Sequence, residues 1–140
     1  MKRSIVAFII GLLAWILIVS LLDRALRVLI VGYAAAEPSL AFTLPMMAAR
    51  LTIAAVTSLI AGAIVAAIAP PGSRAPWVLG ALLLAAFVPE HVHLWNRLPV
   101  WYHLTFLLTL VPLVVIGARL PRVSAVASST AGEQDAMAQR

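Results

Sequence analysis

The segment PEHVHLWNRLPVWYH, from Pro89 to His103, decides the fold, because it separates two long apolar runs at residues 77–88 and 104–118. All three histidines of the chain, two of its four tryptophans and one of its five acidic residues lie in this segment. Polar and aromatic side chains gather where membrane helices meet water. The segment is therefore interpreted as the connection between two membrane-spanning helices.

The composition predicts a membrane protein. Hydrophobic residues make up 64% of the 140 residues and charged residues only 11%, whereas soluble domains are roughly half apolar and a quarter charged. We predict an all-α, polytopic transmembrane bundle of four helices over residues 1–122, with spans at about 4–22, 51–69, 77–95 and 100–118. Residues 123–140 lack apolar periodicity, and a disordered cytoplasmic tail is expected there.

The composition also narrows the classes of function. The chain has no cysteine, which excludes disulfides, thiolate metal sites and a cysteine nucleophile. The formal net charge is +5, but no cluster of four or more Lys or Arg occurs. We therefore expect the basic residues to meet the lipid bilayer rather than nucleic acid. The sequence has no glycine-rich phosphate loop, serine elbow or zinc-protease motif, so neither an enzyme nor a bound cofactor is expected.

Small side chains recur at every fourth residue of the second span. This stripe consists of Ala54, Ser58, Gly62 and Ala66. Small residues let a second helix approach closely in a membrane, where the usual hydrophobic drive for packing is missing. The stripe is predicted to be a helix-packing face, and the partner helix belongs either to this chain or to another copy.

Asp23 and Arg27 follow the first span at a spacing of four residues. This spacing places an acid and a base on neighbouring turns of one helix face, and we interpret them as a surface ion pair. Residues 28–33 are too short to cross a membrane alone. They either prolong the first helix or lie along the membrane interface.

The distribution of Lys and Arg gives the orientation of the spans. With the N-terminus inside, five basic residues lie inside and four outside. The inner set is Lys2, Arg3, Arg74, Arg119 and Arg122, and the outer set is Arg24, Arg27, Arg50 and Arg97. Both termini are therefore predicted to be cytoplasmic. On this assignment an outer aromatic belt comprises Tyr33, Trp95, Trp101 and Tyr102.

The histidine-containing segment allows three interpretations. Glu90, His91, His93 and His103 are residue types that bind zinc, copper or iron. Helical residues two apart point to different faces, however, which argues against convergence of His91 and His93 on one ion. In the second interpretation these side chains face water or phosphate within an interfacial belt. In the third, Glu90 is buried among the helices as a proton or cation relay.

The segment WNRLPVWYHL, from Trp95 to Leu104 and continuing to Pro112 and Gly117, resembles the closing part of small four-helix inner-membrane proteins of bacteria. The small-residue stripe of the second span is similar to their second helix. The resemblance extends over most of residues 1–122. It implies a four-helix architecture in a bacterial inner membrane and carries no activity or site residues.

Two hypotheses of function follow from these observations. The first is a structural or accessory subunit of a membrane assembly, which would use the Ala54, Ser58, Gly62 and Ala66 face on a membrane-protein partner. The alternative is a small homo-oligomeric channel or transporter that depends on Glu90, with a metal ion held by His91, His93 and His103 as a variant.

Overall fold

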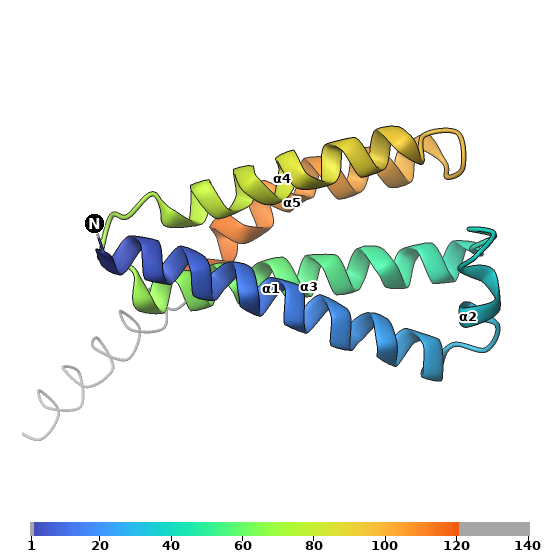
Figure 1. The fold of residues 1–140 in the computed structure, drawn as a ribbon, viewed down its shortest axis with the longest axis horizontal. Coiled ribbons are helices and arrows are strands. Elements are labelled where there is room, and N and C mark those ends of the chain that lie inside the picture. The colour runs from blue at the N-terminus through green and yellow to red at the C-terminus, as the bar shows by residue number, and fades with distance from the viewer. Residues whose placement is uncertain (1, 121–140) are drawn as a thin grey trace, which may run out of the picture.

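The computed structural model describes residues 2–120, and Figure 1 shows their fold. Five helices follow one another in this part of the chain, and no strand is present there. They are α1 (Lys2–Leu29), α2 (Tyr33–Ala36), α3 (Leu44–Ile68), α4 (Ala75–His93) and α5 (Val100–Gly117). The predicted all-α, four-helix class is confirmed, with α2 as an additional short helix. The predicted tail at 123–140 lies outside the described residues.

Prolines mark the starts of three of the long helices. Pro45 and Pro76 lie in the first turn of α3 and α4, and Pro99 directly precedes α5. A proline at a helix start costs no hydrogen bond, because the first amide groups of a helix have no intrahelical partner. Gly72 has φ +76° and turns the chain between α3 and α4, a conformation that glycine adopts without steric cost.

The helices form two antiparallel pairs, α1 with α3 and α4 with α5. In Figure 1 the pairs lie close together near the N-terminus and the α3–α4 turn. They diverge toward α2 and the α4–α5 loop. The buried core links α1, α3, α4 and α5 and includes Ala7, Trp15, Ala61, Val65, Leu79, Leu83, Leu110 and Val114.

Close backbone contact joins α3 to α5. A Cβ atom added to Gly62 would overlap the carbonyl oxygen of Val114, and one added to Gly117 would overlap that of Leu59. Glycines at both positions therefore let the two helices approach until their backbones touch, which is the packing device of membrane helices.

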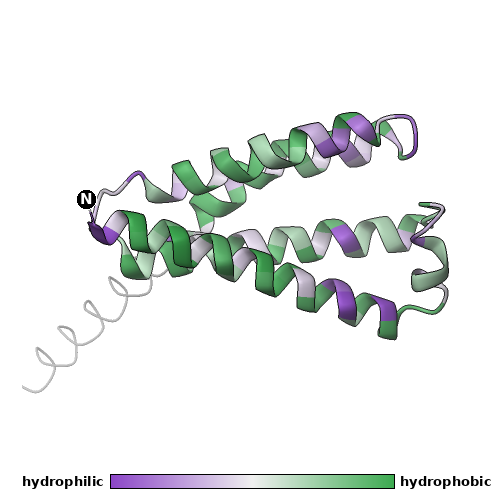
Figure 2. Ribbon diagram, viewed as in Figure 1, coloured by the Kyte–Doolittle hydropathy of each residue, from purple (hydrophilic) through white to green (hydrophobic). Residues whose placement is uncertain are grey.

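The chain is a multi-pass helical membrane protein. Among the described residues, the four long helices have the length and apolar composition needed to cross a bilayer. Figure 2 shows hydrophobic residues along most of the helices and hydrophilic residues toward both ends, at the N-terminus and the α3–α4 turn and again toward α2 and the α4–α5 loop. Large apolar side chains of α1 are exposed and suited to contact lipid, among them Ile5, Ile9, Leu13, Ile16, Leu17 and Leu21.

The helices that carry the first two predicted spans extend beyond those spans. α1 continues past residue 22 to Leu29, and α3 begins at Leu44, before residue 51. Asp23, Arg27 and Arg50 lie on these extensions, where Asp23 pairs with both arginines, as described below.

Candidate functional site: a cavity between the helix pairs

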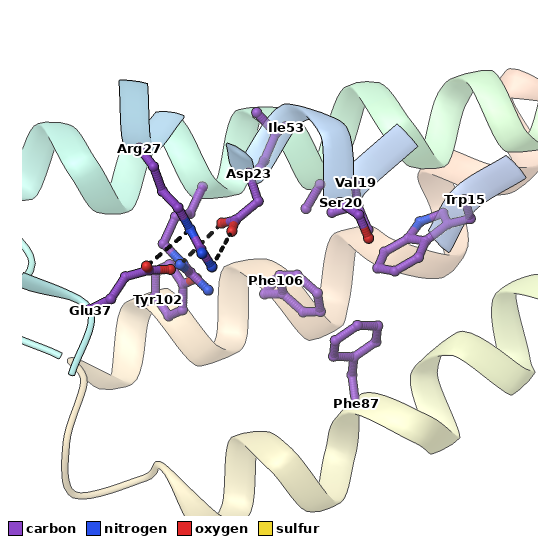
Figure 3. A pocket seen from close by; sticks show the side chains of 12 residues that line it. Trp15, Val19, Ser20, Asp23, Arg27, Glu37, Ile53, Phe87, Tyr102 and Phe106 are labelled. Carbon is purple, nitrogen blue, oxygen red and sulfur yellow. Dashed lines mark hydrogen bonds and ion pairs between the residues drawn. The ribbon is translucent and has the colours of Figure 1, made fainter. Parts of the chain in front are cut away.

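A cavity of about 390 Å³ opens between the two helix pairs, toward the end where they diverge. Figure 3 shows its side chains, which come from α1, the α2–α3 connection, α3, α4 and α5. The lining residues are Trp15, Val19, Ser20, Asp23, Arg27, Glu37, Arg50, Ile53, Ala54, Phe87, Tyr102 and Phe106. We call this space the interhelical cavity. Its volume lies within the roughly 300–1,000 Å³ range of small-molecule sites.

One end of the interhelical cavity is apolar and aromatic. The ring centroids of Trp15 and Phe87 are 5.2 Å apart, and those of Phe87 and Phe106 are 5.1 Å apart. These three rings connect α1, α4 and α5 in the tilted and edge-on geometries that aromatic pairs prefer. The indole Nε1 of Trp15 donates to Ser58 Oγ at 3.1 Å, which fixes the ring against α3.

The other end of the cavity is charged. The guanidinium of Arg27 lies between two carboxylates, 3.1 Å from Asp23 Oδ2 and 3.0 Å from Glu37 Oε2. The pair with Glu37 connects α1 to the segment after α2, and Figure 3 shows the three side chains converging. We call Asp23, Arg27 and Glu37 the acidic triad, because two carboxylates share one guanidinium.

Arg50 projects from α3 into the same end and contacts mainly neutral oxygens. Its Nη1 donates to the Tyr33 hydroxyl at 2.7 Å, and its Nε donates to the Tyr102 hydroxyl at 3.3 Å. Its closest carboxylate oxygen is Asp23 Oδ1, at 3.6 Å. The face of Phe42 lies 4.9 Å from the guanidinium carbon, within the range of a cation–π contact.

Tyr33, in the short α2 helix, is completely buried and links Arg50 to the acidic triad. Its hydroxyl accepts from Arg50 and donates to Asp23 Oδ1 at 3.2 Å. Burial disfavours the phenolate and raises the pKa of Tyr33 to about 12. The charge of Arg50 opposes this shift, while Asp23 adds to it.

The charges of this end are balanced but separated. Two arginines and two carboxylates line the cavity, so their sum is zero. The acidic triad carries one excess negative charge, and Arg50 carries a positive charge that only the longer contact with Asp23 offsets. The site therefore offers a positive and a negative position side by side, next to an aromatic wall.

The predicted ion pair of Asp23 and Arg27 is formed, and Arg27 is exposed, but Asp23 lies deeper than a surface pair requires. The Asp23 side chain is only 24% exposed and also meets Tyr33 and Arg50. The sequence does not predict Arg50, Tyr33, Tyr102 or Glu37 as site residues. Arg50 could have been predicted from the sequence. Pro45 marks a helix start before Arg50, which places Arg50 inside a membrane helix, and a charge there indicates a functional site.

Two of the three histidines meet, away from the lining of the cavity. The Nδ1 atoms of His91 and His103 are 2.7 Å apart, and both rings are buried. Trp95 stacks on His103, and Phe106 packs against His91 at 4.6 Å between centroids. Because Phe106 also lines the cavity, the histidine pair lies directly behind the cavity wall.

The remaining members of the predicted histidine site do not join this pair. Glu90 and His93 are exposed, so the interpretation of Glu90 as a buried relay is wrong. The buried position of His91 likewise contradicts the interpretation in which it faces water. Among residues 2–120, no three His, Cys, Asp or Glu side chains are grouped to hold a metal ion.

Only two of the four residues predicted to form an aromatic belt lie at the surface. Trp95 and Trp101 are exposed, as a belt requires, but Tyr33 and Tyr102 are buried. Their hydroxyl groups bind Arg50 instead of facing the interface.

The small-residue stripe packs within this chain. Ala54, Ser58 and Gly62 are buried, and Ala66 is half-buried. Gly62 lies against Val114 of α5, while Ser58 accepts a hydrogen bond from Trp15 of α1. The partner left open by the sequence is therefore supplied by helices of the same chain.

Known proteins provide no family or function for this chain. No protein-family model, curated protein or solved structure matches the chain.

Proposed function

We propose that this membrane protein binds an amphiphilic molecule in the interhelical cavity. The observation that carries the proposal is the division of one cavity into an aromatic end at Trp15, Phe87 and Phe106 and a charged end around Arg50. An amphiphile has the same division, since its polar head needs hydrogen bonds and its apolar part gains free energy by leaving water.

The position of the cavity supports a ligand taken from the bilayer. The cavity is open rather than enclosed, and it lies where the helix pairs diverge. Its charged residues lie late in α1, directly after α2 and early in α3, at the end of the molecule that carries α2 and the α4–α5 loop. A bound lipid-like molecule would keep its head at that end while its chains pass between the helices into the membrane.

Filling the apolar end tests this proposal. Val19→Trp adds bulk at the cavity wall, whereas Leu17→Trp makes a comparable change on the exposed face of the same helix. We expect native mass spectrometry of the detergent-purified protein to detect one bound amphiphile per chain. The complex should persist in Leu17→Trp and be lost in Val19→Trp. Equal retention in both variants, or no bound amphiphile in the wild type, would contradict the proposal.

An accessory role in a membrane assembly remains a prediction from the sequence. Since Ser58 and Gly62 are used inside the chain, a partner protein would have to bind a different face. Co-purification of the tagged protein in mild detergent tests this role, and a stoichiometric second protein is its expected result. A homo-oligomeric channel would have to use Glu90 at the exposed surface of α4 rather than inside the bundle.

A further inference from the structure

The charges of the interhelical cavity restrict the head group that it can accept. This inference rests on the proposed function, because it concerns the ligand of the same cavity. Asp23, Arg27, Glu37 and Arg50 together have zero net charge. A head group with a net charge would leave one charge of this network uncompensated in a cavity that is only partly open to water, where an unpaired charge costs more free energy than in bulk water.

The positive position is at Arg50. Its short contacts are to the neutral hydroxyl groups of Tyr33 and Tyr102, and its ion pair with Asp23 is the longest in the network, at 3.6 Å. A guanidinium in this setting gains free energy from an anionic oxygen ligand. Arginine is also the side chain whose planar group of donors best matches phosphate.

The negative position is at the acidic triad. Asp23 and Glu37 both bind Arg27, so two carboxylates share one cation, and the side chain of each carboxylate is 24% exposed. A primary ammonium can donate up to three hydrogen bonds to such oxygens. A quaternary ammonium has no N–H group and cannot do so.

We infer that the interhelical cavity selects a zwitterionic glycerophospholipid whose head group combines a phosphate with a primary ammonium. The phosphate binds Arg50, and the ammonium binds the carboxylates of the acidic triad. The acyl chains lie against Trp15, Phe87 and Phe106 and leave through the open side of the cavity. Phosphatidylethanolamine has this chemistry and serves as the probe.

The test compares lipids that share acyl chains and differ only in the head group. Delipidated protein is offered phosphatidylethanolamine, phosphatidylcholine, phosphatidylglycerol and diacylglycerol, and occupancy is measured by native mass spectrometry. We expect phosphatidylethanolamine to bind about tenfold more tightly than phosphatidylcholine or phosphatidylglycerol, the ratio that one charge-assisted hydrogen bond provides. Diacylglycerol, which lacks both the phosphate and the ammonium, should bind most weakly. Glycerophosphoethanolamine, which lacks acyl chains, should compete only weakly.

Charge-neutralising variants assign the two parts of the head group. Glu37→Gln should abolish the preference for phosphatidylethanolamine over phosphatidylcholine, and Arg50→Gln should weaken the binding of all three phospholipids. Glu90→Gln and Arg97→Gln are the matched controls, because both residues are exposed and lie outside the cavity lining, and both variants should behave as the wild type.

The outcomes separate this inference from the proposed function. Binding of all four lipids with equal affinity, still blocked by Val19→Trp, would overturn the head-group selectivity and leave the amphiphile cavity intact. Binding that Val19→Trp does not affect would overturn both. Competition by glycerophosphoethanolamine as strong as by the lipid would show that the head alone is the ligand, which overturns the choice of a phospholipid.

Discussion

The side chain of Tyr33 links two of the long helices by hydrogen bonds. Its buried hydroxyl joins Arg50 of α3 to Asp23 of α1, two residues that line the charged end of the cavity. In the sequence, Tyr33 is one aromatic residue after a glycine in a connecting segment, and this position predicts a place in an outer aromatic belt. The role of Tyr33 depends on the residues that surround it in the folded protein. The local sequence does not specify these neighbours.

The raised pKa of Tyr33 gives a prediction at this scale. The pKa of about 12 exceeds the ordinary value of 10.0, so the folded state holds this proton more tightly than the unfolded state. The stabilising effect is complete below pH 10 and is lost as the pH rises to about 12. In Tyr102→Phe, which leaves Tyr33 as the single tyrosine, we expect the tyrosinate absorbance to appear near pH 12.

Circular dichroism recorded during this titration serves as the control, because the helices must persist while the absorbance changes. A tyrosinate transition centred near pH 10 in the folded protein would contradict the burial of Tyr33 between α1 and α3.

At the scale of the helices, the main feature of the bundle is the backbone contact between α3 and α5. The fourfold spacing of small residues predicted correctly that α3 has a packing face, since this pattern belongs to the sequence of one helix. The identity of the helix that packs there was not predictable. It depends on the meeting of Gly62 with Val114 and of Gly117 with Leu59, residues more than fifty positions apart.

Gly62→Ala should destabilise the bundle, because the added methyl group overlaps the backbone of α5 and forces the helices apart. Overpacking of this kind costs about 1–3 kcal/mol. Unfolding of the protein in mixed micelles by increasing SDS measures the loss. Gly80→Ala is the matched control, because its added Cβ would lie 3.2 Å from the nearest atoms of Val111 and should cost less. An equal loss in both variants would contradict the close α3–α5 contact.

The arrangement of the whole molecule places its connections at opposite ends. The α3–α4 turn lies at the end of α1 that carries the N-terminus, and the α2 segment lies at the other end. The side chain of Arg97 in the α4–α5 loop approaches the Ser39 carbonyl oxygen at 3.4 Å, which brings the two connections at that other end together.

Cysteine labelling tests this arrangement together with the predicted cytoplasmic termini. The chain contains no cysteine, so Ser39→Cys and Pro71→Cys each introduce a single reactive thiol at an exposed position. In intact cells we expect a membrane-impermeant maleimide to label Ser39→Cys, and to label Pro71→Cys only after permeabilisation. The reverse pattern would contradict the orientation, and labelling of both from one side would contradict the four-span arrangement.

The sequence by itself determined the helical class, the number of spans and the position of the α3–α4 turn. In a bilayer every backbone amide must be satisfied within its own helix, so long apolar runs and prolines are enough to predict these features. The tertiary structure decided how the side chains combine. Arg50 and Tyr102 lie on helices that are far apart in the chain, and they meet in one cavity because α3 and α5 pack side by side, with backbone contacts at Gly62 and Gly117.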